Sequence, residues 1–237
     1  MAGLSISPVT DGVVVAELDR GPDNLWSLTD LRELVALLEA PPEGAHVLRV
    51  RSVGEAFCRG RERGGTSTAP GVVRGEAETL VAVTRAFRRT RLVTVAEVQG
   101  DAAGFGVGVL AACDVAVAVA DARFSFPEVG IGLAPALVLA WLPRKVGERQ
   151  AFWLTATGEA VPAVRALELG LLNAVVSSAD ELRKDVDERV AALRARSPRV
   201  HAEIKDMLRA FGAVGDDQVL DMSIDRLVVG SLRRGEE

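Results

Sequence analysis

The chain has 237 residues, 49% of them hydrophobic and 26% charged, which is typical of a globular protein with a sizeable core. Its net charge of −5, without a concentrated Lys/Arg block, argues against nucleic-acid binding. The richest apolar run, residues 105–120, is too short to span a bilayer and is interrupted by Asp114. The N-terminus lacks the basic start and apolar core of a signal peptide, so we expect a cytoplasmic protein with no membrane partner.

Few side chains are suited to nucleophilic or metal chemistry. The sequence has two cysteines, Cys58 and Cys113, two histidines, His46 and His201, and no tyrosine. A Ser-His-Asp or Cys-His mechanism needs a histidine beside its nucleophile. However, His46 begins an apolar run and His201 lies in a polar helical stretch. We therefore expect no catalytic histidine, no disulfide framework, no metal and no permanently bound cofactor.

The N-terminal part predicts a β-hairpin followed by a helix. An Asp-Gly turn at 11–12 separates two β-rich runs, residues 4–8 and 13–18. The helix can be capped by Ser27 or Thr29. Its apolar residues recur at helical spacing: Leu31, Leu34, Val35 and Leu38.

Strands and helices alternate along the middle of the chain. In order, the sequence predicts a strand at 46–52, a helix at 72–89, a strand at 91–98, a helical run after the glycines of 100–108, and a strand at 115–120. The alternation ends near residue 176, and helices follow, the last of them starting at Pro198. This order predicts an α/β fold with a helical C-terminal region.

Three loops that follow predicted strands combine backbone freedom with polar groups. They are residues 56–65, 100–108 and 126–135. Ligands of α/β sheets collect at the carboxyl ends of strands, so these loops are expected to converge on one site.

The second of these loops is rich in glycine and precedes a helix. The N–H groups at a helix start favour an anion, and glycines let a ligand approach the backbone. The spacing from Gly104 is G-x-G-x-G, which is not the dinucleotide fingerprint G-x-G-x-x-G. Close packing between a helix and a strand is an equally simple reason for these glycines.

Glu128 is the candidate acid or base of the third loop. It follows Pro127 among apolar residues, where burial raises the pKa of a carboxyl toward neutrality and suits it to general acid/base catalysis. An exposed glutamate in a turn is the alternative interpretation.

Four segments together resemble the crotonase (enoyl-CoA hydratase/isomerase) superfamily, in the same order along nearly the whole chain. Residues 21–39 resemble its early asparagine loop and first helix, and residues 55–62 resemble its first oxyanion-hole loop. Residues 97–135 resemble its central signature, and residues 141–176 the segment after it.

The resemblance implies a spiral of ββα units with the active site, residues 1–178, and a helical trimerisation region, residues 179–237. Its members stabilise a thioester enolate with two backbone N–H groups, which correspond here to those of Arg61 and Phe105. Removing one such donor typically costs about 3–4 kcal/mol of transition-state stabilisation. Phe105 departs from the family, which usually has glycine there.

The family's hydratases often use two glutamates, and only one is present here. Glu128 matches the one in a Pro-Glu dipeptide, whereas Gly108 stands where the other is expected. Three reactions stay open: isomerisation of a 3-enoyl-CoA by one base, hydration or a lyase reaction with a water relay, and a specialised decarboxylation or hydrolysis. A non-catalytic accessory protein that binds CoA esters is the alternative to an enzyme.

The remaining predicted contacts are to the acyl-CoA substrate, and coenzyme A enters only as part of it. We expect substrate contacts from Cys58, Arg59, Gly104, Gly108 and Ala134. Arg59, Arg61 and Arg63 could meet CoA phosphates or simply belong to a solvated loop. Cys58 is expected to be a small buried residue rather than a nucleophile. The aromatic residues expected in the core or at a subunit interface are Trp141, Phe152 and Trp153.

Overall fold

The computed structural model describes residues 3–62 and 69–211. The chain divides into two compact units, residues 1–195 and 196–237. The predicted division after residue 178 differs from this one by a helix, α8 (Ala179–Arg194), which belongs to the first unit. In the second unit, the described part contains α9 (Pro198–Phe211), which begins at the proline expected to start it.

A six-stranded sheet forms the centre of the first unit. Its strands lie in the order β1 (Leu4–Ile6), β2 (Val13–Leu18), β3 (Val47–Ser52), β4 (Val93–Val98), β6 (Val115–Val119) and β9 (Ala174–Val176). The β1–β2 pair is antiparallel and every later pair is parallel. Since β4 is buried on both faces, its continuous apolar sequence is the pattern of a central parallel strand.

The predicted hairpin is confirmed, and local geometry explains it. Asp11 and Gly12 have φ values of 49° and 76°, the two positive values of a type I′ turn. The flanking Thr10 and Val13 exchange both backbone hydrogen bonds, at 3.0 and 2.9 Å. Between this turn and the strand pair, in which Leu4 faces Leu18, the register shifts by one residue.

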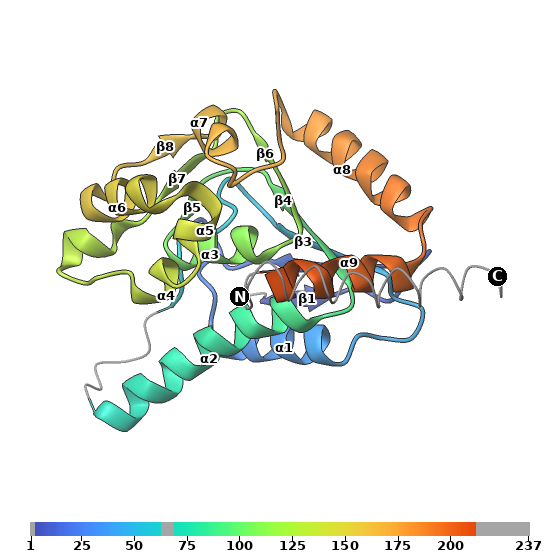
Figure 1. The fold of residues 1–237 in the computed structure, drawn as a ribbon, viewed down its shortest axis with the longest axis horizontal. Coiled ribbons are helices and arrows are strands. Elements are labelled where there is room, and N and C mark those ends of the chain that lie inside the picture. The colour runs from blue at the N-terminus through green and yellow to red at the C-terminus, as the bar shows by residue number, and fades with distance from the viewer. Residues whose placement is uncertain (1–2, 63–68, 212–237) are drawn as a thin grey trace. The chain divides into compact units, whose positions relative to one another are not determined.

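Helices cover both faces of the large sheet (Figure 1). The first helices, α1 (Leu28–Glu39) and α2 (Pro70–Arg89), pack against each other, and α2 also contacts α3 (Phe105–Ala112). On the other face, α8 packs on β3, β4, β6 and β9. Ser27, one of the two expected caps, begins α1 and forms a capping box with Asp30.

A second, three-stranded sheet carries the loops of interest. Its strands lie in the order β5 (Ala102–Ala103), β7 (Arg123–Ser125) and β8 (Val161–Pro162). The 3₁₀ helix η1 (Pro127–Ile131) follows β7 directly. Short helices then lead to β9: α4 (Ala136–Leu139), α5 (Leu142–Val146), α6 (Glu148–Thr157) and α7 (Ala163–Glu168).

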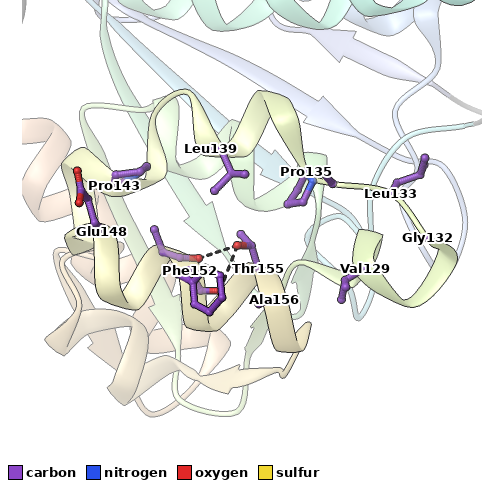
Figure 2. Close-up of a pocket in the computed structure, with 12 residues that line it drawn as sticks. Val129, Gly132, Leu133, Pro135, Leu139, Pro143, Glu148, Phe152, Thr155 and Ala156 are labelled. Carbon is purple, nitrogen blue, oxygen red and sulfur yellow. Dashed lines mark hydrogen bonds between the residues drawn. The ribbon is translucent and has the colours of Figure 1, made fainter.

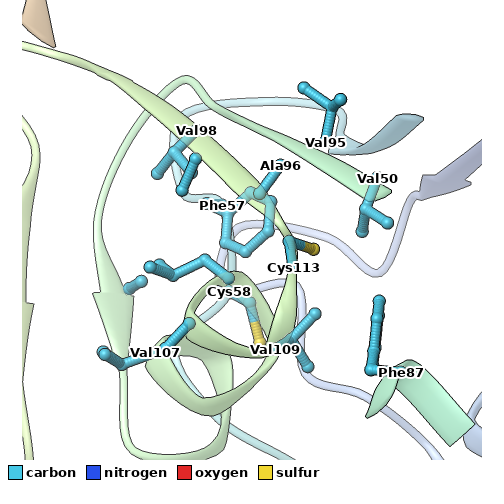
Figure 3. Packing of buried hydrophobic residues seen from close by; sticks show 14 of the residues in the cluster. Val50, Phe57, Cys58, Phe87, Val95, Ala96, Val98, Val107, Val109 and Cys113 are labelled. Carbon is cyan, nitrogen blue, oxygen red and sulfur yellow. The ribbon is translucent and has the colours of Figure 1, made fainter. Parts of the chain in front are cut away.

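The core joins the large sheet to α3. Figure 3 shows Phe57 and Cys58, which precede the first loop's exposed end, packed beside Val107 and Val109 of α3. All four side chains are at most 1% exposed. The first two of the three loops predicted to carry chemistry are therefore anchored in one apolar cluster.

Within the described residues, no helix is both long and apolar enough to cross a membrane.

Candidate active site

The side chain of Asn24 holds the start of the first loop in place. Its side-chain amide is fully buried and donates to the carbonyl oxygens of Val53 and Ala56, both at 2.7 Å. Its own carbonyl oxygen accepts from the N–H of Arg20 at 2.8 Å. Because all these groups are satisfied within the protein, the start of the loop is held firmly.

Trp26 then sets the direction of the Arg61 N–H. The backbone N–H of Trp26 donates to the Gly60 carbonyl at 3.2 Å, and the backbone carbonyl of Trp26 accepts from the backbone N–H of Glu62 at 2.8 Å. In extended chain, successive N–H groups point to opposite sides. The Arg61 N–H therefore points away from Trp26, and it donates no hydrogen bond within residues 3–62 and 69–211.

The first two loops meet through their backbones. The Cys58 N–H donates to the Asp101 carbonyl at 3.1 Å, and the Cys58 carbonyl accepts from the Ala103 N–H at 2.9 Å. A Cβ on Gly60 would lie 3.9 Å from the Ala103 carbonyl oxygen. The segment around Arg61 and the start of α3 are thus neighbours.

Two glycines of the second loop are required by this contact. A Cβ on Gly100 would lie 1.7 Å from the carbonyl oxygen of Glu55, and one on Gly106 would lie 2.1 Å from that of Cys58. No side chain fits at such distances. For these two positions, the close packing considered from the sequence is the reason for glycine.

The other two glycines lie on the face of α3 that Glu128 approaches. Gly104 caps the helix with φ +52°, and a Cβ there would lie 2.9 Å from Glu128 Oε1. Phe105 is the first residue of α3, and its N–H donates no hydrogen bond within the described residues. That group belongs to the positive end of the helix, where developing negative charge is stabilised.

Glu128 is half-buried rather than exposed, and its carboxyl is poorly partnered. Burial raises the pKa of Glu128, while a hydrogen bond from its own backbone N–H acts in the opposite direction. Its Oε2 is buried and has no hydrogen-bond partner within the described structure. A raised pKa brings such a carboxyl closer to the behaviour that a proton carrier needs.

Gly108 lies one helical turn after Gly104 and leaves space empty. Its N–H donates to the Gly104 carbonyl at 3.2 Å, so the two residues share one face of α3. A Cβ on Gly108 would meet nothing within 4 Å among the described residues.

Ala134 lies in a different surrounding. It is exposed and lines an apolar cavity of about 520 Å³, together with Val129, the residue after Glu128. Figure 2 shows Pro135 and Leu139 on one side of this cavity and Phe152 and Thr155 of α6 facing them. Glu128 is not among the residues that line this cavity.

The arginines of the first loop are already paired with acids. Arg59 is exposed and binds Asp23 and Asp101, each at 3.1 Å, which links the first loop to the second. Arg63 lies outside the described residues. Cys58 is buried, and burial raises the pKa of its thiol to about 12, so the thiol is not a nucleophile at neutral pH.

One contact of the site has no signal in the sequence. The Arg61 side chain binds Glu76 of α2, with Nη1 and Oε2 3.1 Å apart, and both groups are largely covered. A solvated arginine and a helical glutamate look ordinary in sequence, because only the packing of α2 brings them together. Among the described residues, no three His, Cys, Asp or Glu side chains form a possible metal site.

Comparisons with known proteins agree with this architecture. A structure titled an enoyl-CoA hydratase from Mycobacterium smegmatis superposes with a TM-score of 0.91, at 25% identity over 97% of this chain and 91% of that one. A structure from Thermobifida fusca in complex with CoA has a TM-score of 0.87 at 23% identity, covering the whole of this chain and 95% of that one. The fold is therefore that of the crotonases, and the predicted α/β spiral is confirmed.

The sequence comparisons define the family. A "probable enoyl-CoA hydratase" of Rhodobacter capsulatus is 33% identical over 180 residues, which cover 73% of this chain and 68% of that protein. The family model described as enoyl-CoA hydratase/isomerase matches residues 9–226. The chain belongs to the enoyl-CoA hydratase/isomerase family.

Proposed function

We propose that this protein transforms an acyl-CoA thioester through an enolate. The N–H groups of Arg61 and Phe105 hold the thioester oxygen, and Glu128 moves the proton. The observation that carries this proposal is the closeness of the Glu128 carboxyl to Gly104, the residue directly before Phe105, where an added Cβ would lie 2.9 Å from Oε1. Acid/base group and oxyanion donor are thereby adjacent, as enolate formation requires.

The reaction best supported is the shift of a double bond. The Glu128 carboxylate removes a proton from C2 of a 3-enoyl-CoA, and the electron pair moves onto the thioester oxygen as a dienolate. The same carboxyl then returns the proton to C4, which leaves the double bond between C2 and C3. One acid/base group suffices, in agreement with a glycine at position 108.

Hydration is the second candidate, and the open space at Gly108 favours it. A water molecule there could relay a proton to or from Glu128, so that one carboxyl serves water addition to a 2-enoyl-CoA. The specialised decarboxylase or hydrolase and the non-catalytic CoA-ester-binding protein are the remaining hypotheses. Retention of a poorly partnered acid among apolar groups argues against the non-catalytic one, because such an acid destabilises the fold.

Coenzyme A is proposed as the carrier because the Thermobifida fusca relative is titled as a CoA complex. Contacts from Cys58, Arg59, Gly104, Gly108 and Ala134 remain predictions. Arg59 would have to exchange at least one of its two acidic partners for a phosphate. The cytoplasmic location also stays a prediction.

The assembly is proposed to be a homotrimer or a dimer of trimers. Phe152 and Trp153 of α6 are 72% and 55% exposed, which fits a subunit interface better than a core, whereas Trp141 is half-buried against Phe126. Analytical ultracentrifugation tests this directly. A monomer at micromolar concentration contradicts it.

Incubation in D₂O with matched 2-enoyl-CoA and 3-enoyl-CoA esters distinguishes the reactions. An isomerase converts the 3-enoyl ester to the 2-enoyl ester, and deuterium enters to the extent that the proton on Glu128 exchanges with solvent before it is returned. A hydratase gives a product heavier by one water from the 2-enoyl ester. If neither ester is isomerised, exchanges deuterium or changes mass, while CoA esters still bind, the proposal of catalysis is wrong and the accessory role is supported.

A further inference from the structure

The face of α3 toward Glu128 carries no side chain over a full helical turn. A Cβ on Gly104 would lie 2.9 Å from Glu128 Oε1, and Gly108 follows four residues later, about 6 Å along the helix axis. The space beyond Gly108 is empty of described atoms to 4 Å. A bound acyl group that reaches Glu128 would therefore find room on this side.

Gly108 is not required by the backbone or by packing. Gly106 must be glycine because of the Cys58 carbonyl, and Gly104 has a positive φ, but Gly108 has neither constraint. A glycine in a helix destabilises it relative to alanine. The absence of a side chain at this position thus brings no structural gain.

Resting on the proposed function, we infer that Gly108 determines specificity by admitting an acyl group with a branch or ring near C3. In the proposed reaction Glu128 exchanges protons at C2 and C4, the carbons on either side of C3. A substituent on C3 would then extend from the carboxyl toward the space at Gly108, one helical turn beyond Gly104. A linear acyl group leaves this space unfilled. A methyl branch or ring fills it and gains apolar contact with α3.

The test replaces the missing side chain. Gly108→Ala and Gly108→Val are compared with the wild type on a linear enoyl-CoA and its 3-methyl-branched counterpart of equal chain length. The ratio of kcat/KM for the branched ester to that for the linear one should fall about 10- to 200-fold in Gly108→Val, the range for one methylene in a fitted pocket, and less in Gly108→Ala.

Gly75 supplies the matched control. It is also a helical glycine, in α2, where a Cβ would meet nothing within 4 Å, and it is exposed. Gly75→Ala and Gly75→Val should leave the ratio within about twofold of the wild type. Thermal unfolding of both alanine variants should occur at or above the wild-type temperature, which excludes misfolding as the cause of a changed ratio.

The two levels of the argument fail differently. If the wild type turns over both esters and the ratio in Gly108→Val stays within threefold, this inference is wrong and the proposed function stands. An equal loss on both esters also contradicts it, because the space then serves every acyl group alike. If the wild type neither binds nor converts any CoA ester, the proposed function fails and the inference fails with it.

Discussion

Two carboxyl groups of the first unit lie in opposite surroundings. Asp30 of α1 is 2% exposed, and both of its oxygens are occupied. Arg20 contacts them in a bidentate pair, with both distances at 3.0 Å, and Ser27 Oγ donates to Oδ2 at 2.7 Å. Although burial alone would raise the pKa of Asp30, these hydrogen bonds hold it below its ordinary value.

Glu128 has almost none of these partners. Burial raises its pKa, and its Oε2 is covered without a donor among the described residues. Asp30 therefore stabilises the fold as an anion, whereas the anionic form of Glu128 is disfavoured by burial and gains little from hydrogen bonds. The contrast teaches that burial alone does not identify a functional acid, and that the partners decide.

The largest effect expected is on turnover by Glu128→Gln. The amide keeps the shape but cannot carry the proton, so kcat should fall about 10³- to 10⁴-fold, at the upper end for a general acid/base. Steady-state kinetics with the productive enoyl-CoA ester, and calorimetric binding of a saturated CoA ester, measure the two parts. Unchanged turnover excludes Glu128 as the acid/base, and lost binding would point to a structural role.

Asp30→Ala should act on stability instead. It removes the bidentate partner of Arg20 and the acidic half of the α1 capping box, and breaking a buried ion pair costs about 3–5 kcal/mol. Urea unfolding at a fixed protein concentration measures the loss. Asp23→Ala is the control, because Asp23 pairs with Arg59 at the surface and should cost at most about 1 kcal/mol. Similar losses would remove the distinction between the two acids.

The features that the sequence predicted well are those decided by local geometry. The hairpin follows from positive φ at Asp11 and Gly12, and the start of α1 follows from the Ser27 cap. The convergence of the first two loops follows from their positions after parallel strands β3 and β4. The short helices between η1 and β9 lack a strong period and were not predicted individually.

Contacts between distant residues were beyond prediction. All four glycines of the second loop look alike in sequence. However, the carbonyl of Cys58, nearly fifty residues earlier, leaves no room for a side chain at Gly106, whereas no described atom limits the side chain at Gly108. The partners of Glu128 likewise depend on how η1 packs. The fold could thus be predicted, the role of Glu128 as the acid stays a prediction, and the packing reasons for individual glycines could not be predicted.

The pH dependence of stability should have opposite signs at the two acids. Glu128 has a raised pKa, so its contribution to stability is present below its ordinary value of 4.5 and is lost as the pH rises through the folded-state value. Asp30 has a lowered pKa, so its contribution is present above 3.8 and is lost as the pH falls.

Urea unfolding of the wild type, Glu128→Gln and Asp30→Asn across this range measures both trends. Relative to the wild type, the free energy of unfolding of Glu128→Gln should rise by about 1 kcal/mol or more as the pH rises to neutrality, since an uncompensated buried charge is removed. For Asp30→Asn, the deficit in unfolding free energy relative to the wild type should become smaller as the pH falls. Parallel curves for the two variants would contradict the assigned partners.

The smallest effect expected concerns Glu76, which has a partner yet lies beside the proposed site. Its ion pair with Arg61 ties the segment that presents the Arg61 N–H to α2. Glu76→Gln should lower kcat by less than tenfold with little change in KM, because the donor is displaced slightly rather than removed. The double-mutant coupling of Arg61 and Glu76 in stability should be about 0.5–1 kcal/mol.

The pair Arg74–Glu78 on the same helix is the matched control. It is a highly exposed i,i+4 pair at 2.8 Å and has no contact with the first loop among the described residues. Glu78→Gln should leave kcat unchanged. If Glu78→Gln lowers kcat as much as Glu76→Gln, the effect arises from α2 as a whole. If Glu76→Gln has no effect on kcat while its coupling to Arg61 is measured, that pair is structural, as the pair of Asp30 is.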